Sequence, residues 1–536
     1  MKKLKLVCVA IAMAGAAPTF AGGLLTNTNQ HVAFNRMMSR EASIGIDGVY
    51  YNPAGVVFMG EGHHLAINWQ LAYQTRTINN DYSLFTNNVN NPITPRDFKG
   101  KAFAPVIPSF QYAYNKGKWS FQANFALTGG GGKCTFDDGL GSFEKIVSET
   151  AIAACGLAGV VDQTLGNKLG QQGMEMFTSD QAFGKTGKYS FNSYMHGRQY
   201  YYGLSAGAAY KFCDNFSAFL GVRGVYALTN YYGYVENINV GNMPLYKVLD
   251  PTKENAANIE LSCDQTGVGF TPIIGVDYKT GRWNFSAKYE FKTRIRLKNK
   301  SVNQTPSIGN LPANLANQMT GILTARYQQA GLPLEQAKQQ AENTTNAVLN
   351  DPTVGATMMG LKTQFDQKLN KAIGEYEDGK KIAGDIPGYL ALGIGYSPVD
   401  AVRVNVGFHW FDDKNATSYN NRNKELKRGT LEYNAGVEVD VNKKITLSTG
   451  WQNTNYGLSD EYMDDKSFVV GSNSAAIGGV YHINKKMDLN VAYFHTFYQH
   501  KKTSETVQLA ADKSIVYNSD YTRNNNVFAV GLDINF

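Results

Sequence analysis

The last twelve residues of the chain, 525–536, read NNVFAVGLDINF. They alternate strictly, with Phe528, Val530, Leu532 and Ile534 in one set and mostly small or polar residues in the other. A period of two places such sets on opposite faces of a β-strand. Chain ends fray unless neighbours hold them. A strand that runs to the final residue therefore needs a partner on each side, and a closed barrel supplies both.

The opposite end of the chain indicates export. Residues 1–21 begin with a basic stretch (Lys2, Lys3 and Lys5), continue with an apolar run over 6–17, and end on the small-residue site TFA. This three-part pattern is typical of a secretory signal peptide. We therefore expect residues 1–21 to be removed and the mature protein to leave the cytoplasm.

Composition favours a membrane barrel over other classes. The 536 residues include 54 Gly, 32 Tyr and 28 Phe, and the mean hydropathy is −0.32. After the signal, no apolar run approaches the roughly 18 residues that a membrane helix needs, so strands would have to do the spanning. The formal charge of +7 falls to +4 without the three signal lysines. A balance this mild predicts no nucleic-acid partner.

Alternating segments recur along the chain and are joined in two different ways. Examples are HLAINWQLAYQ (64–74), AVRVNVGFHW (401–410) and TLEYNAGVEVD (430–440), each with an apolar face and a polar face. Tight Gly, Asn, Asp and Pro turns join some of them, whereas the segments 79–102, 129–197, 236–264 and 299–385 are long. Short turns on one side and long loops on the other are typical of outer-membrane barrels. We predict an all-β fold, a transmembrane antiparallel barrel of fourteen strands over residues 63–536.

Two of the long segments also contain apolar residues at helical spacing. One stripe lies within 143–169, and two more lie at 315–323 and 358–373. These stripes predict helices in the extracellular loops. The helices would pack against each other and the barrel rim, or would present a pliable apolar surface to a ligand.

The preface to the first strand, residues 22–62, is too polar and irregular to be a strand itself. Within it, NRMMSREASIGIDGVYYNPAG (35–55) contains the run Glu41-Ala42-Ser43, then Asp47, then Asn52-Pro53-Ala54-Gly55. This pattern resembles the N-terminal hatch of the FadL family, outer-membrane transporters of long-chain fatty acids and other hydrophobic compounds. The resemblance implies that residues 22–62 form a plug inside the barrel, held by Asp47, Asn52, Pro53, Ala54 and Gly55.

The resemblance also implies a route for the ligand. In the family, substrate collects on the outer loops, enters the lumen, and leaves sideways through a gap at the third strand. Here the third strand runs into FALTGGGGKC (125–134). Glycines hold strand geometry weakly and carry no side chain to seal a wall. The implied exit lies at Gly129, Gly130 and Gly131; a flexible entry into a loop remains an equal alternative.

Cations are expected on the inner face of one strand. Alternation over 282–299 sends Trp283, Phe285, Tyr289, Phe291 and Ile295 to lipid and Lys288, Glu290, Lys292, Arg294 and Arg296 to the lumen, with Arg223 also inward. These cations could pair with Glu290, Glu432 and Glu438 as a lining. Alternatively, one of Arg223, Lys288, Lys292 and Arg294 orients the carboxylate of a fatty acid.

Other functions have weaker support in the sequence. An enzyme is not expected, because His409 is the one mid-strand lumenal histidine and neither Ser286 nor Ser448 lies in a nucleophile motif. A diffusion porin would share the barrel but not the hatch, and an adhesin or receptor would use the long loops. The mature cysteines, Cys134, Cys155, Cys213 and Cys263, lack metal-ligand spacing and allow three disulfide pairings, among which the sequence does not choose.

The sequence therefore predicts a monomer in the lipid bilayer of a bacterial outer membrane. Its partner would be a long-chain fatty acid or another hydrophobic ligand. We expect no cofactor, no metal and no nucleic acid.

Overall fold

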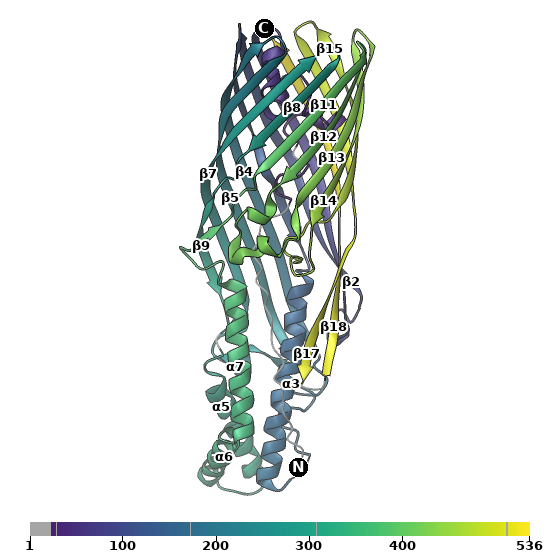
Figure 1. Ribbon diagram of the computed structural model, residues 1–536. Helices are drawn as coiled ribbons and strands as arrows, with labels where there is room; N and C mark the ends of the chain where they lie inside the picture. Colours follow the sequence, from purple (N-terminus) through teal and green to yellow (C-terminus); the bar gives the residue numbers. More distant parts are fainter. Residues whose placement is uncertain (1–22, 28, 172, 307, 511–512) are drawn as a thin grey trace.

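The computed structural model describes residues 23–27, 29–171, 173–306, 308–510 and 513–536, and is a long barrel with helices at one end (Figure 1). The expected signal peptide, 1–21, lies outside the described residues. The first half of the barrel contains β1 Gly62–Tyr82, β2 Arg96–Lys116, β3 Trp119–Phe136, β4 Tyr189–Cys213, β5 Phe216–Val240, β7 Ile259–Thr280, and β8 Trp283–Glu290 continued by β9 Arg296–Gln304. The second half contains β10 Lys381–Ala383 continued by β11 Tyr389–Val399, β12 Val402–Phe411, β13 Arg428–Asn442, β14 Ile445–Gly457, β15 Ser472–Asn484, β16 Met487–Tyr498 continued by β17 Lys501–Ala510, and β18 Lys513–Asn535.

Three of the barrel strands are interrupted, and each consists of two segments: β8 with β9, β10 with β11, and β16 with β17. Counted in this way, the described residues form fourteen antiparallel barrel strands, as predicted. A short strand, β6 Met243–Pro244, pairs with the end of β5. The barrel closes where β1 pairs with β18, in an unbroken register from His64 opposite Asn535 to Tyr82 opposite Tyr517. The last residue takes part, since the Phe536 N–H donates to the His63 carbonyl at 2.9 Å. Closure leaves no unpaired edge along this seam, as lipid requires.

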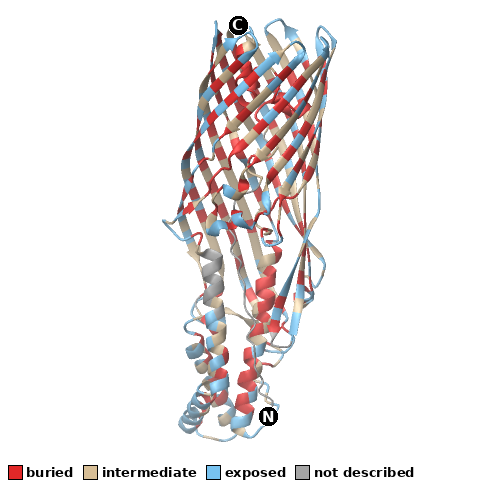
Figure 2. Cartoon of the chain, viewed as in Figure 1, coloured by how far each residue is buried: buried red, intermediate tan, exposed pale blue. Residues whose placement is uncertain are grey.

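The two faces of the strands are those expected from the alternation. On β1 the side chains of Ile67 and Trp69 are exposed, whereas those of Asn68 and Gln70, which alternate with them, are buried. The same holds on β18, where Phe528 is exposed and Val527 is buried. Figure 2 shows the resulting checkered pattern along the whole wall. The barrel therefore presents apolar side chains to its surroundings and polar side chains to its interior, the arrangement of a membrane barrel.

The strands run further than the sequence indicated at the long-loop end. The four long loops are therefore shorter than the sequence predicted, and comprise residues 83–95, 137–188, 241–258 and 305–380. For example, β4 begins at Tyr189 within YSFNSYMHGRQYYYG, where polar and aromatic residues mix on both faces. Beyond the membrane the outer face meets water, so a strand there needs no apolar face and loses the pattern that would identify it.

Helices gather at this end of the barrel, as Figure 1 shows. They are α3 Gly141–Leu169, α4 Tyr246–Leu249, α5 Leu311–Gln329, α6 Leu334–Leu349 and α7 Pro352–Ile373, with short 3₁₀ helices η2 Ser83–Asn87, η3 Asp413–Asn415 and η4 Tyr419–Glu425. Among the described residues only α3 is long and apolar enough to cross a membrane as a helix. It packs instead against α6, α7 and η2. The expected loop helices are therefore present, and α3 belongs to the loop layer.

The four cysteines among the described residues do not form disulfides. Cys134 and Cys263 are buried thiols, Cys155 is partly buried and Cys213 is exposed. None of the three possible pairings is therefore realised.

The N-terminal segment, residues 23–61, lies inside the barrel. It contains α1 Val32–Met37, α2 Gly48–Tyr51 and η1 Gly55–Phe58. Every residue of α1 is buried, and this helix packs against β13 to β16, β18 and β1. The wall makes room for it with glycines: a Cβ at Gly450 would lie 1.6 Å from the Met37 carbonyl oxygen. The N-terminal segment therefore packs directly against backbone atoms of the inner wall, at positions where glycine has no side chain.

We predict that Gly450→Val displaces the N-terminal segment without preventing barrel formation. The added side chain would occupy the place of the Met37 carbonyl, so the segment has to move. Limited proteolysis should then cleave within residues 23–61 at least tenfold faster than in the unaltered protein.

The matched control is Gly224→Val on β5, where the nearest side-chain atom to an added Cβ is 3.7 Å away. This variant should keep the original cleavage rate. Equal rates for all three proteins would contradict the fit described here.

Candidate functional site

The turn at Asn52–Gly55 ties the N-terminal segment to the wall. The Asn52 Nδ2 donates to Asp277 Oδ2 on β7 at 2.6 Å, and the Gly55 N–H donates to Asn52 Oδ1 at 3.2 Å. The neighbouring carbonyls accept from the wall: Gln122 of β3 donates to the Pro53 oxygen at 2.7 Å, and Ser217 of β5 donates to the Ala54 oxygen at 2.7 Å.

Glycine is required at the end of this turn. A Cβ on Gly55 would come within 2.3 Å of Asn52 Nδ2 and 3.1 Å of Asp277 Oδ2. It would therefore break the hydrogen bond that joins turn and wall. The four residues Asn52, Pro53, Ala54 and Gly55 thus act together, through one side chain, two carbonyls and one missing Cβ.

Asp47 lies in a buried ionic cluster. Its carboxylate accepts two hydrogen bonds from Arg40, at 2.6 Å and 3.0 Å. Arg40 also contacts Glu438 of β13 at 3.2 Å, and Arg36 donates to the same carboxylate. Removing one partner from such a cluster leaves a buried charge uncompensated, which costs several kcal/mol, about 3–5. Asp47 therefore orients Arg40 toward the wall and touches the wall only through it.

His409, the lumenal histidine of β12, is held between two carboxylates. Its Nε2 lies 2.7 Å from Glu41 Oε1 and its Nδ1 lies 2.9 Å from Glu432 Oε2. Ser286 donates to the Glu41 carbonyl, and Ser448 accepts from Arg36 at 3.0 Å. Neither hydroxyl contacts the imidazole, so the described residues contain no serine–histidine pair here. The cluster ties the segment to the wall.

The first two expected ligand-binding cations, Arg223 and Lys288, are buried and already paired. Arg223 binds Glu290, and the Lys288 Nζ donates to Glu290 Oε1 at 2.9 Å and to the Tyr50 carbonyl at 2.7 Å. The Tyr50 ring lies 4.0 Å from the same ammonium. These contacts favour the hypothesis that Arg223 and Lys288 pair with acidic residues of the wall over the hypothesis that they bind the carboxylate of a fatty acid.

The prediction for Arg294 was wrong. Arg294 is exposed, whereas Ile295 is fully buried. Lys292 is already paired, because it donates to the Asn415 carbonyl at 3.0 Å and lies 3.8 Å from the Asp385 carboxylate. The chain leaves strand geometry between β8 and β9, and one residue more lies between Glu290 and Lys298 than between their partners on β7. A one-residue bulge exchanges the two faces. Arg294 therefore faces outward, and Ile295 faces inward.

The glycines of β3 coincide with a break in the wall. Pairing between β2 and β3 stops at Phe103 opposite Lys133 and resumes only at Ser109 opposite Ala126. Gly130 and Gly132 have left-handed φ values of 82° and 95°. On the inner side, a Cβ at Gly129 would lie 2.7 Å from the Leu24 side chain. The N-terminal segment thus covers a stretch of wall that lacks β2–β3 hydrogen bonds.

A cavity of about 220 Å³ extends from these glycines across the lumen. Its apolar walls include Ile107, Leu127, Phe136, Met195, Phe468 and Phe494, and its polar residues include Gln74, Gln199, Arg76 and Arg523. The two arginines face each other directly across the β1–β18 seam. The cavity therefore has mixed polar and apolar walls, contains the two facing arginines and reaches the broken part of the wall.

Neither arginine has an acidic partner among the described residues. Arg523 donates to Gln74 Oε1 at 2.8 Å and lies 5.1 Å from the Tyr498 ring, and Arg76 donates to the same Gln74 oxygen at 3.3 Å. The Arg523 Nε is buried without a hydrogen-bond partner. Like charges directly opposite each other destabilise a sheet. This cost would be offset by an anion bound between them.

Sequence reasoning missed this pair. Arg76 lies close to the predicted start of a loop, and Arg523 precedes the alternation that marks the last strand. Nothing in the sequence states that the two strands are neighbours or gives their register. The one available signal was position: closure makes the first and last strands partners, which brings QTR (74–76) and TRN (522–524) onto one seam.

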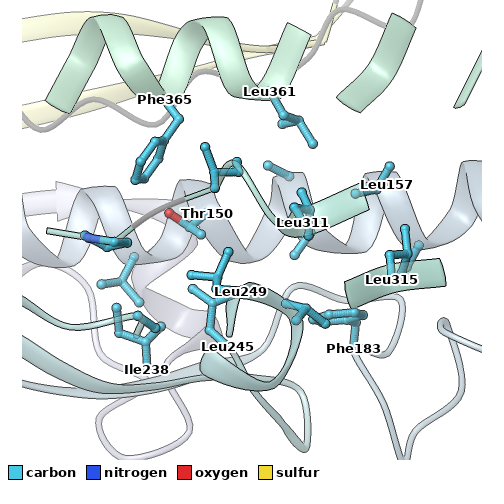
Figure 3. Close-up of a pocket in the computed structure, with 18 of the residues that line it drawn as sticks. Thr150, Leu157, Phe183, Ile238, Leu245, Leu249, Leu311, Leu315, Leu361 and Phe365 are labelled. Carbon is cyan, nitrogen blue, oxygen red and sulfur yellow. The ribbon is translucent and has the colours of Figure 1, made fainter. Parts of the chain in front are cut away.

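A second pocket, lined almost entirely by apolar side chains, lies in the helical layer outside the barrel. It has a volume of about 110 Å³ and is lined by residues of α3, α5 and α7 and the loop after β5. In Figure 3, Leu157, Leu311, Leu315 and Phe365 point into it from different elements. Among the described residues, no charged side chain lines the pocket. It suits an alkyl chain or an aromatic ring.

We predict that Asn52→Asp loosens the segment more than Asn52→Ala does. Aspartate would place a second carboxylate beside Asp277, where the amide now donates at 2.6 Å. Repulsion then adds to the lost hydrogen bond. Hydrogen exchange of residues 43–58 should rise in the order unaltered, alanine, aspartate. The opposite order for the two variants would contradict the tether.

Comparisons with known proteins agree on the architecture. No protein-family profile matches the chain, and no curated protein sequence matches it. The crystal structure of a Pseudomonas aeruginosa FadL homologue superposes with a TM-score of 0.58 at 13% identity, covering 96% of this chain and 100% of the other.

Two further structures are similar at lower scores. The Ralstonia pickettii toluene transporter TbuX has a TM-score of 0.46 at 13% identity, covering 96% and 99% of the two chains. The Pseudomonas putida toluene transporter TodX has 0.46 at 12%, covering 98% and 100%. We conclude that this chain is a transmembrane β-barrel with the fold of the FadL family.

Proposed function

We propose that the protein takes up hydrophobic small molecules across a bacterial outer membrane, and that its ligands include long-chain fatty acids. The observation that carries the second part is the pair Arg76 and Arg523, two cations that have no acidic partner among the described residues and that line a cavity with both polar and apolar walls. A carboxylate can bind both guanidinium groups, while the acyl chain lies on the apolar walls.

The ligand would first enter the pocket of the helical layer. Its walls are almost entirely apolar and come from several helices, including α3 and α5. Transfer of an alkyl chain from water to such a surface is worth about 0.8 kcal/mol for each methylene. The pocket would therefore concentrate dilute hydrophobic ligands at the mouth of the barrel.

From the lumenal cavity the ligand would leave sideways. The cavity reaches Gly129 and Gly130, where β2 and β3 are not hydrogen-bonded to each other. A lateral path keeps the acyl chain in an apolar medium, whereas an axial path would bring it back into water. The N-terminal segment would act as the hatch, with Leu24 retracting from Gly129 to open the path.

The two alternatives raised by the sequence have less support. The segment 23–61 fills the lumen through buried ionic and hydrogen-bonded contacts, such as Arg40 with Glu438. A diffusion porin needs a water-filled channel, and a lumen filled in this way does not favour that function. A receptor role for the long loops is compatible with uptake and would use other surfaces. We propose a monomer, since one chain closes its own barrel.

We predict that Arg76→Gln and Arg523→Gln each weaken the binding of a long-chain fatty acid about ten- to a hundredfold. One charge-assisted hydrogen bond contributes roughly 1.5–3 kcal/mol, whereas the acyl chain contributes more in total. The fatty alcohol of equal length should bind all variants within about twofold. Titration of the purified protein with both ligands measures the difference.

Arg294→Gln is the matched control, because it removes an arginine that faces outward. It should bind the acid as the unaltered protein does. Equal losses for acid and alcohol in the Arg76 and Arg523 variants would mean that these residues shape the cavity without recognising the head group.

We predict that a disulfide across the β2–β3 break blocks uptake but not binding. An added Cβ at Gly132 would lie 3.3 Å from the Ala104 Cβ, close to the separation in a disulfide. Ala104→Cys with Gly132→Cys, in a background in which Cys134 is Ser, should lose at least tenfold of its fatty-acid uptake when oxidised.

The reduced form of the same variant is the control, because it carries the same backbone strain. Reduction should restore uptake, and fatty-acid binding to the purified protein should be equal in both states. Uptake that does not depend on the redox state would refute a lateral exit at this place.

A further inference from the structure

The bulge between β8 and β9 places a row of basic side chains on the outer wall. Arg294, Arg296, Lys298 and Lys300 are all exposed, while the residues between them, Ile295, Leu297 and Asn299, are buried. Leu297 and Ile295 pack in an inner cluster that includes Leu25 of the N-terminal segment. The basic side chains therefore point away from the lumen. This surface, with Lys381 of β10, is called the basic stripe below.

Much of the charge of the stripe is uncompensated. Arg296 binds Asp385 at 2.8 Å, and Lys300 lies opposite Asp264 of β7. No ion pair is found for Arg294, Lys298 or Lys381 within the part of the chain that the structure describes. Lys381 is moreover the direct cross-strand partner of Lys298. Two lysines in this position repel each other unless an anion lies between them.

The stripe begins where the apolar band of the barrel ends. On the neighbouring β7, outward side chains are apolar and exposed from Tyr278 to Val268, ten residues apart. At about 3.3 Å per residue and a tilt of about 40°, this length gives a height of about 25 Å, the thickness of the apolar band of a membrane barrel. The next outward positions, Thr266 and Asp264, are polar and lie opposite Lys298 and Lys300.

Large apolar side chains lie directly beside the basic ones. Phe270 is 70% exposed and Val268 is 63% exposed on β7, and Phe291 is 43% exposed at the start of the bulge. In Figure 1, β9 is at the helix-bearing end of the barrel, next to β7. An occupant of this surface would meet apolar groups on the membrane side and cations on the water side.

We propose that the basic stripe binds a phosphorylated lipid of the membrane leaflet that faces the long loops. The phosphate groups would lie among Arg294, Lys298 and Lys381, and the acyl chains would lie on Phe270 and Phe291. Guanidinium and ammonium groups are the usual protein partners of phosphate. The inference relies on the proposed outer-membrane location for its orientation, but not on the identity of the transported ligand.

The test compares lipid retention by purified variants. The neutralised variant carries Arg294→Gln, Lys298→Gln, Lys300→Gln and Lys381→Gln, and leaves Arg296 with its partner Asp385. Each protein is incubated in detergent with lipid A carrying two phosphates, washed, and examined by native mass spectrometry. The neutralised variant should retain at least tenfold less lipid than the unaltered protein.

The control removes four charges from the opposite end of the barrel. Lys443, Lys444, Lys485 and Lys486 are exposed in two tight turns, and their replacement by Gln should leave retention unchanged. A charge-retaining variant, Arg294→Lys with Lys298→Arg, should also retain lipid, which separates loss of charge from misfolding. Slower gel migration after boiling checks barrel formation in each case.

Three results would overturn the proposal. The first is equal retention by the neutralised and control variants. The second is equal retention of lipid A after its phosphates are removed. The third is full displacement of the lipid by inorganic phosphate at equal concentration, which would identify a site for a free anion. Fatty-acid uptake is measured separately on the same variants, so a failure of the transport proposal would not be mistaken for a failure of this one.

Discussion

The seam between β1 and β18 is the constraint on which the rest of the structure depends. In lipid a strand edge cannot be hydrated, so the first and last strands have to pair along their whole length. Their unbroken register from His64 to Tyr82 fixes which side chains face inward. It also decides that Arg76 and Arg523 meet. This pair of cations, which has no acidic partner among the described residues, is thus a consequence of barrel closure.

Against this continuous wall, two local irregularities stand out. At β3 the loss of pairing with β2 coincides with glycines and with the lumenal cavity. At β8–β9 one additional residue exchanges the two faces and turns Arg294 outward. Both are departures from regular strand geometry, and both lie beside surfaces suited to lipids. Bulges and glycines in barrels commonly mark sites where the wall has a task besides enclosing the lumen.

The cations of the lumen fall into two groups, those with a carboxylate partner and those without one. Arg36 and Arg40 fasten the N-terminal segment to the wall through Glu438. Lys288 and Arg223 pair with Glu290 within the wall and contact Tyr50 of the segment. Among the described residues, Arg76 and Arg523 have amide, carbonyl and aromatic partners but no acidic one. A buried pair adds little net stability, but loss of one partner costs much. The matched cations therefore hold the segment in place, and the pair without an acidic partner is the one that we propose as the binding site for a carboxylate.

The sequence by itself determined the barrel, its fourteen strands, the direction of most side chains and the helices of the loops, because period-two and period-3.6 patterns are local. The Asn52–Gly55 turn was also visible, since Pro and Gly carry their own backbone preferences. Only the tertiary structure decided the partners of each charge and the faces beyond a bulge. Arg294 was misplaced because one additional residue inverts every later position. Arg76 and Arg523 were missed because the register that unites them joins residues more than four hundred positions apart.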